Sequence, residues 1–247
     1  MKKMKNNKIS VSVILAILIS IFISGNLFAQ RIVEQKSVIN LKQEILLNFQ
    51  FADKINVTTW NGDEIKIKAT VDIDNNKHND AFSFQIEKKS DKITIKSEIE
   101  DLAELSLLNR KKDENFEIHC DFEVIIPVKM ALSIKTINGN IVVGGNYRSL
   151  CLKSISGDVE VECKFNSLHM NSISGDVDLS VSDNIEADFN MSTLTGDVYS
   201  DLEFGESTKK KSSYWTIGHK INKKYNGGGI NVTMGSISGN VYLRETK

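Results

Sequence analysis

An octet of residues that repeats five times in the C-terminal half constrains the fold of this chain more than any other feature of its sequence. Each copy has a Ser or Thr, an aliphatic residue, a second small polar residue, a glycine, an Asp or Asn, and then an apolar residue that opens an alternating run. The copies lie at residues 136–143, 154–161, 172–179, 193–200 and 236–243. Their glycines are 18, 18, 21 and 43 residues apart. A period near 20 residues is typical of a solenoid, whose coils bury their apolar faces against one another.

The residue types of the octet predict a strand, a corner and a second strand. β-branched residues favour extended backbone, a glycine followed by Asp or Asn favours a tight turn, and the residues after it alternate between apolar and polar. Parallel pairing between coils would use every backbone N–H group, which agrees with the absence of proline after Pro127. Further inward-facing apolar pairs are expected between the octets, at Leu150/Leu152, Leu168/Met170 and Phe189/Met191.

These patterns predict an all-β solenoid whose glycine-marked coils lie over one another and share one hydrophobic interior. Ile155, Ile173 and Leu194 should therefore come together in adjacent coils. The 43-residue step would hold one more, degenerate coil at residues 216–218. A Greek-key sandwich is the alternative architecture, but it would not require the same octet five times.

The N-terminal half also has the pattern of β-strands. A turn at residues 60–63 separates two short alternating runs, which indicates either a hairpin or a first coil. Residues 100–115 favour a short helix or an irregular excursion, and residues 116–126 form the clearest strand pattern of the chain. We expect a leading β-strand unit over residues 31–130 and β-solenoid repeats over residues 131–247, with an insertion at residues 203–229.

Residues 1–30 have the features of a secretory signal peptide. An uncharged, mostly aliphatic run spans residues 11–23, and a cleavage site is expected near Ala29. Thirteen helical residues rise only about 20 Å, less than the roughly 30 Å of a bilayer core. We therefore expect an exported protein (periplasmic, on the cell surface or secreted) with no membrane span after cleavage, and an uncleaved N-terminal anchor is the alternative. The positive region before the apolar run consists of Lys2, Lys3, Lys5 and Lys8.

The charge balance argues against a nucleic-acid partner. The chain has 31 basic and 32 acidic residues, whereas nucleic-acid binders usually carry a basic excess. Removal of residues 1–30 would take away four lysines and no acid, which leaves 27 basic and 32 acidic residues and a net charge of −5.

The three cysteines do not form a recognisable metal or redox motif. They are odd in number and include no Cys-x-x-Cys pair, so neither a metal knuckle nor a thioredoxin-type site is expected. Strand alternation places Cys120 and Cys163 inward as small buried groups and Cys151 outward. A disulfide between Cys120 and Cys163 is open at this point, because an exported protein would meet an oxidising compartment.

Several segments resemble a bacterial family of exported β-strand-repeat proteins, the "putative adhesin" family, which is related to autotransporter adhesin-head and toast-rack domains. The similar segments are Ile125-Ile126-Pro127, residues 132–141, the turn at residues 58–63 and the repeated Ser-Ile-Ser-Gly-Asp. The resemblance covers roughly residues 38–247. It implies a right-handed single-stranded β-helix-like solenoid in the cell envelope and no catalytic residue. The insertion at residues 203–229 departs from the even coil spacing of that family.

Two groups of residues are candidates for a functional site. If the octets stack in register, Asp158, Asp176 and Asp197 form a column of acids flanked by Asn140 and Asn240. Such a column could bind calcium weakly or serve catalysis, but Asp and Asn after glycine are also ordinary turn residues whose side chains bond nearby backbone. We favour that structural role, and no cofactor is expected.

The second group is a cationic and aromatic patch within the insertion. Tyr and Trp side chains among lysines can hold sugars, anionic polymers or a partner surface. The simpler alternative is a solvated excursion in which the tryptophan packs back onto the solenoid. The members of this patch are Lys209, Lys210, Lys211, Tyr214, Trp215, Lys220, Lys223, Lys224 and Tyr225.

Together these features predict a non-catalytic protein of the cell envelope, an adhesin-like or envelope-stress interaction module. Its partner would be an envelope protein, a glycan or a surface polymer. The alternative is a polysaccharide lyase or hydrolase on a β-helix scaffold. An enzyme of that kind would need convergent, non-repeated acids and bases in a cleft.

Overall fold

The computed structural model describes residues 30–110, 115–204 and 218–246. These residues form seventeen β-strands, a single turn of 3-10 helix (η1, Asn79–Ala81) and one short α-helix (α2, Leu102–Arg110). The expected all-β class is confirmed, and so is the short helix within residues 100–115. The signal-peptide prediction falls outside the described residues. No helix of the described part is long and apolar enough to cross a membrane.

Each repeat of the C-terminal half folds as a coil of two strands joined at the glycine of the octet. The first strands of the coils pair in parallel with one another in one layer, and the second strands pair in parallel in a second layer. Strand β8 (Ala131–Asn146) runs through its corner without a break. The other coils are β9 (Ser149–Ser156) with β10 (Val159–Lys164), β11 (Ser167–Ser174) with β12 (Val177–Val181), β13 (Ala187–Thr193) with β14 (Val198–Ser200), and β16 (Ile230–Ser238) with β17 (Val241–Glu245).

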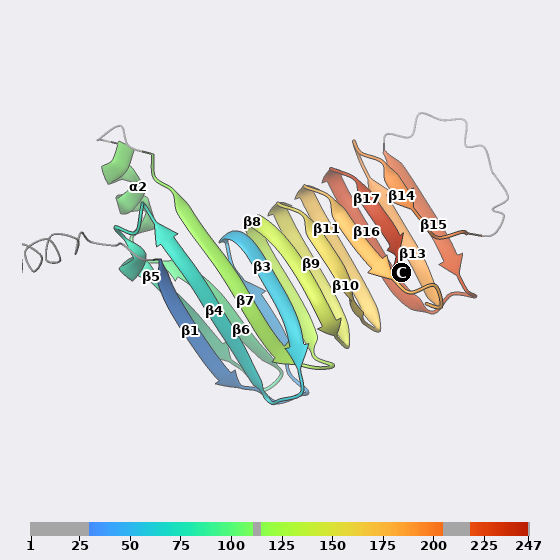
Figure 1. The fold of residues 1–247 in the computed structure, drawn as a ribbon, viewed down its shortest axis with the longest axis horizontal. Coiled ribbons are helices and arrows are strands. Elements are labelled where there is room, and N and C mark those ends of the chain that lie inside the picture. The colour runs from blue at the N-terminus through green and yellow to red at the C-terminus, as the bar shows by residue number, and fades with distance from the viewer. Residues whose placement is uncertain (1–29, 111–114, 205–217, 247) are drawn as a thin grey trace, which may run out of the picture.

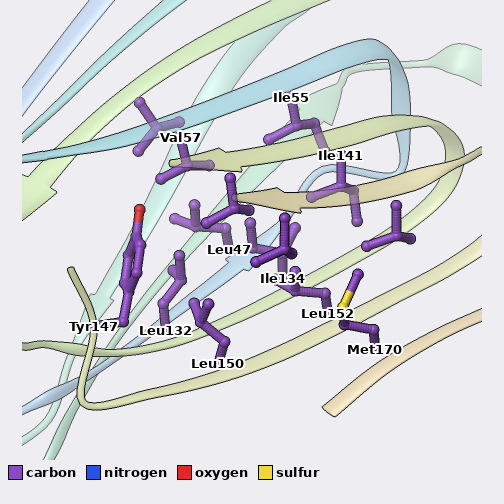
Figure 2. Packing of buried hydrophobic residues seen from close by; sticks show 14 of the residues in the cluster. Leu47, Ile55, Val57, Leu132, Ile134, Ile141, Tyr147, Leu150, Leu152 and Met170 are labelled. Atoms are coloured by element: carbon purple, nitrogen blue, oxygen red, sulfur yellow. The ribbon is translucent and has the colours of Figure 1, made fainter. Parts of the chain in front are cut away.

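The hydrophobic core lies between the two layers. Figure 2 shows Ile134, Leu152 and Met170 on one side of this core and Ile55 and Ile141 on the other; all five side chains are fully buried. The register places identical positions of the repeat beside one another, so that each layer presents continuous apolar rows to the other. The inward-facing pairs that were predicted between the octets are confirmed as buried: Leu150/Leu152, Leu168/Met170 and Phe189/Met191.

The coils do not follow one another in the order of the chain. Strands β16 and β17 pair with β11 and β12 on one side and with β13 and β14 on the other. The last coil, drawn in red, therefore lies between two coils that precede it in sequence (Figure 1). The expectation of successive coils is wrong here, because every coil offers nearly the same edge and the octet does not specify which coil follows it.

The long step between the fourth and fifth octets does not add another parallel coil to the end of the stack. Strand β15 (His219–Tyr225) instead runs antiparallel to β13 along its outer edge. The expected degenerate coil at residues 216–218 lies mostly outside the described residues. Of its three residues only Gly218 is described, and it lies against the backbone of Thr193 and Leu194.

A similar insertion occurs at the N-terminal end. Strands β2 (Glu44–Asn48) and β3 (Phe51–Trp60) form a coil beside β8, and β6 (Lys92–Ile99) and β7 (Ile118–Pro127) flank its other side. Strand β4 (Glu64–Ile73) follows β3 in sequence but pairs with β7 and with β1 (Arg31–Val38). The two runs on either side of the turn at residues 60–63 therefore form no hairpin with each other. The first coil contains only the earlier run, β3, together with β2. Strand β5 (Phe82–Lys88) closes the other layer by antiparallel pairing with β6.

The corners of neighbouring coils are in direct contact. A Cβ atom placed on Gly157 would lie 2.2 Å from the carbonyl oxygen of Gly139, and one on Gly175 would lie 2.3 Å from that of Gly157. Gly157 also has a positive φ of 146°, which L side chains rarely adopt. Only glycine therefore allows the coils to approach to the spacing of a β-ladder at this point.

The first hydroxyl residue of each octet is buried, and in three of the five octets its hydroxyl binds the corner of a neighbouring coil. Ser172, Ser236 and Thr193 donate to the carbonyl oxygens of Gly157, Gly175 and Gly239 over 2.9, 2.8 and 2.7 Å. The hydroxyl of Ser154 occupies the equivalent position, but it is buried and has no hydrogen-bond partner among the described residues.

Strand β3 is fixed to β7 by a carboxylate at an irregularity in its pairing. The register of β3 against β8 shifts between Phe51 and Lys54. Within that interval, Asp53 Oδ2 accepts a hydrogen bond from the backbone N–H of Cys120 at 3.1 Å and lies 3.2 Å from Nδ1 of His119. Glu117 approaches the other ring nitrogen of His119 at 3.6 Å.

All three cysteines are free thiols, so the disulfide between Cys120 and Cys163, which the sequence left open, is not present. Cys120 is buried, whereas Cys151 and Cys163 are half-buried. Burial raises the pKa of both the Cys120 and the Cys163 thiol to about 12. The thiol groups therefore act as small apolar side chains and form no bridge.

We predict that Gly157→Ala destabilises the protein by at least about 2 kcal/mol, because the new methyl group would overlap the Gly139 carbonyl and the backbone would be strained. Chemical denaturation measures this difference in unfolding free energy. Gly144→Ala is the matched control, since its Cβ would meet only one atom, at 3.9 Å, and we expect a change of less than about 1 kcal/mol. Equal effects of the two substitutions would contradict the corner packing.

We predict opposite outcomes for two serines at equivalent positions. Ser154→Ala should leave the unfolding free energy unchanged or raise it, because it removes a buried hydroxyl that has no partner. Ser172→Ala should lower it by about 1 kcal/mol, because it removes a hydrogen bond to the corner. Chemical denaturation of the two variants tests this difference, provided that their unfolding free energies depend equally on denaturant concentration. A greater loss of unfolding free energy in Ser154→Ala than in Ser172→Ala would disprove it.

We predict a raised pKa for His119 and a matching pH dependence. Partial burial lowers the pKa of the ring, but the attraction of Asp53 and Glu117 and their hydrogen bonds outweigh this effect and hold the pKa above 6.5. The stabilisation by the protonated ring is complete below pH 6.5 and is lost as the pH rises through the folded-state pKa. A titration of the His119 ring signals by NMR should give a lower pKa in Asp53→Asn than in the unmodified protein; an unchanged value would refute the assignment.

Candidate functional site

A row of exposed aliphatic side chains runs across the outside of the first layer, next to the corners. These side chains occupy the second position of the five octets. Ile155, Ile173 and Ile237 are 47–48 % exposed, and the two others are 38 % and 46 % exposed. We call this set the apolar row; in spatial order it consists of Ile137, Ile155, Ile173, Ile237 and Leu194.

The apolar row confirms the stacking of the octets but not the position of every member. Ile155 and Ile173 lie on adjacent strands, as expected. Leu194 is separated from Ile173 by Ile237, because the last coil is inserted between theirs. All three side chains expected to mark the stack lie on the outer surface, whereas the shared interior is filled by other positions of the repeat.

A second row, two residues before the apolar row, carries lysines and amides. Lys135 and Lys153 are direct neighbours on β8 and β9, and Asn48 and Asn171 flank them on β2 and β11. Lys135 and Lys153 are exposed, and within the described residues neither forms an ion pair.

A groove of about 350 Å³ lies between the two rows. One side consists of Ile137, Ile155 and Ile173, and the other of the two lysines with Asn48 and Asn171. The buried hydroxyl residues that separate the rows along each strand also line it, together with Gln50. These hydroxyl residues are Thr136, Ser154 and Ser172.

A histidine lies beside the lysine side of this groove. Burial lowers the pKa of His169, and the positive charge of Lys153 lowers it further. Nε2 of His169 is 2.6 Å from the side-chain nitrogen of Asn171, and the outward-facing Cys151 is its neighbour on β9. His169 is therefore neutral at physiological pH and adds no positive charge.

The acids after the corner glycines form a column, as expected, but in a different order. The spatial sequence is Asn140, Asp158, Asp176, Asn240, Asp197, so that only Asp158 and Asp176 are neighbouring carboxylates. Each side chain accepts a hydrogen bond from the backbone N–H of the next member, over 2.9, 2.8, 2.6 and 3.0 Å. In the described part of the chain, no group of three or more His, Cys, Asp or Glu side chains could hold a metal ion.

Four of the nine patch residues are described, and they lie on β15. Lys220 and Lys224 are exposed on one face of this strand, and Lys224 lies 3.7 Å from Asp188. Tyr225 instead packs against Phe204, with ring centroids 5.9 Å apart. The other five members lie outside the described residues: Lys209, Lys210, Lys211, Tyr214 and Trp215.

An aromatic pair on the second layer was not found from the sequence. Tyr199 and Tyr242 stack with centroids 5.2 Å apart. The Arg244 guanidinium lies 4.8 Å from the Tyr242 ring and is 2.7 Å from Asp178. The two tyrosines occupy the same octet position, but only the insertion of the last coil makes β14 and β17 neighbours.

The comparison with solved structures confirms the fold. A "putative cell adhesion protein" from Clostridium sporogenes has 14 % sequence identity and a TM-score of 0.57, over 87 % of this chain and 100 % of that one. A "putative adhesin" from Bacteroides fragilis has 10 % identity and a TM-score of 0.34, over 88 % and 98 % of the two chains. A "putative lipid binding protein" from Parabacteroides distasonis has 11 % identity and a TM-score of 0.26, over 87 % and 97 %. At these identities the first structure supports the fold alone, and the lower scores of the other two carry no argument.

The sequence comparisons give a more specific result. No curated protein matches the chain. Residues 126–238 match the family described as Toastrack DUF4097. This stretch begins at the end of β7 and includes β8 to β15 and all of β16, so it contains four complete octets and the first three residues of the fifth. Residues 126–238, which carry the apolar row and the parts of the groove on β8, β9 and β11, therefore match the Toastrack domain of the DUF4097 family.

Proposed function

We propose that this chain is a non-catalytic protein of the cell envelope, an adhesin-like or envelope-stress interaction module. It binds an envelope protein, a glycan or a surface polymer through side chains displayed on its outer surface. The observation that carries this proposal is the repetition of exposed side chains at fixed ladder positions, which produces long rows of one chemical type. Solenoids commonly use such extended surfaces for binding.

Export is part of the proposal and is supported by the features of residues 1–30. With the signal peptide removed, residues 31–130 would act as a leading unit for the coils of residues 131–247. A right-handed path of the coils is supported by the strong preference for right-handed crossovers between parallel strands.

The alternative of a lyase or hydrolase receives no support from the geometry of the described residues. The acids of the corner column recur in each coil, and their side chains accept hydrogen bonds from backbone N–H groups. Their structural role accounts for their presence without a catalytic one.

We propose the lysine patch of residues 209–225 as one binding surface for an anionic partner. Lys220 and Lys224 lie on β15, which covers the end of the stack beside β13 and has no further strand on its outer side among the described residues. The charges of Lys220 and Lys224 lie at this end of the stack, where a large polymer can approach.

We predict that replacement of the six patch lysines by glutamine lowers retention of the purified protein on its own isolated cell envelope by roughly tenfold, because screened attraction to anionic polymer is lost. The variant changes Lys209, Lys210, Lys211, Lys220, Lys223 and Lys224. Retention is measured by sedimentation of the envelope at low and high salt, and in the unmodified protein it should fall with salt.

The matched control removes six exposed lysines elsewhere and has the same net charge. Equal losses in both variants, or unchanged retention in the patch variant, would contradict a specific role of the patch. The control changes Lys36, Lys42, Lys54, Lys88, Lys89 and Lys164.

A further inference from the structure

The groove beside the apolar row has two features that the stability of the fold does not require. One side repeats an aliphatic side chain in three adjacent coils, although about half of each such side chain remains in contact with water. The other side places Lys135 and Lys153 next to each other. The volume of about 350 Å³ lies within the range of small-molecule sites.

The lysine side of the groove favours an anion. The backbones of Lys135 and Lys153 are one ladder spacing apart, about 4.8 Å, so that two positive charges lie on neighbouring strands. Neither has a carboxylate partner within the described residues, and His169 is neutral. The nearest acids of the corner column are turned to the backbone of the adjoining coils. An anionic group between the two lysines would be attracted by both charges.

The aliphatic side of the groove indicates the chemistry of the uncharged part of the ligand. None of the described residues that line the groove is aromatic, so they offer no stacking surface for a sugar ring or a nucleobase. The strands beneath it are paired on both sides, so a peptide cannot add to them as a further strand. The groove crosses β2, β8, β9 and β11, which gives it a length of about 14 Å at the spacing of a β-ladder. A flexible hydrocarbon chain fits such an elongated aliphatic surface.

We infer that this groove binds a single-chain amphiphile with an anionic head group. Its hydrocarbon chain lies across the strands against Ile137, Ile155 and Ile173. Its head group lies between Lys135 and Lys153, with the amides of Asn48 and Asn171 as further hydrogen-bond donors. The inference rests on the groove alone and does not depend on the lysine patch or on the identity of an envelope partner.

Calorimetric titration with dodecanoate below its critical micelle concentration tests this inference directly. We expect saturable binding at one site per chain, and binding of dodecyl maltoside, which has the same chain and no charge, should be at least about tenfold weaker. Absence of dodecanoate binding would overturn the inference. So would equal affinity for both probes, or binding to anionic phospholipid vesicles without any binding of the monomeric probe.

Two pairs of variants locate the site. Ile155→Ser should weaken dodecanoate binding by roughly fivefold to tenfold, whereas Ile237→Ser should not change it, because Ile237 is equally exposed in the same row but does not line the groove. Lys135→Gln combined with Lys153→Gln should remove the preference for the anionic probe, and Lys164→Gln should preserve it. Thermal unfolding of each variant confirms that the fold is intact, and equal effects within either pair would refute the location.

Discussion

The rest of this structure depends on the close contact between the corner glycines of neighbouring coils. Each octet turns at a glycine whose Cα faces the carbonyl of the adjacent coil, at a distance that leaves no room for a methyl group. This contact brings the backbones to ladder spacing and sets the register of the strands on both sides of the corner. The inward hydroxyl of three octets and the outward Asp or Asn then bind the adjoining coil on either side of the glycine. A register error of one residue would break all three contacts and would also turn the apolar residues outward.

The local structure was well determined by the sequence, because the octet encodes it within eight residues. The strands, the glycine corners and the buried pairs such as Leu150 and Leu152 follow from alternation and turn chemistry, and these predictions are confirmed. The order of the coils was not predictable in this way. The edges of β11 and β13 offer the same hydrogen bonds to any coil with the octet pattern, so the choice of β16 as their common neighbour depends on the path of the whole chain.

In the candidate site, too, features within one octet could be predicted from the sequence, whereas features that combine several coils could not. The acid column was visible in the sequence, and so was its structural explanation by turn chemistry. The lysine side of the groove was not, because Lys135 and Lys153 belong to different coils and precede the octet by one residue. Only the parallel register places them together. The stacking of Tyr199 on Tyr242 could not be predicted without knowing the order of the coils in space. Repetition thus multiplies any exposed residue type along the stack, and the surface chemistry depends on which coils become neighbours.

The position of the last coil has a consequence for how this polypeptide reaches its native state. Residues 230–245 occupy an internal place in the stack, with ladders on both of their edges. A ribosome or a translocation pore delivers this segment after both of the coils that flank it, so the coil of residues 187–200 cannot join its native neighbour until residues 230–245 have emerged. Stepwise growth from the N-terminus, which suits an ordinary solenoid, therefore cannot finish this one. A prematurely terminated copy would expose two unsatisfied strand edges in the middle of the stack, and quality control could recognise it by that gap.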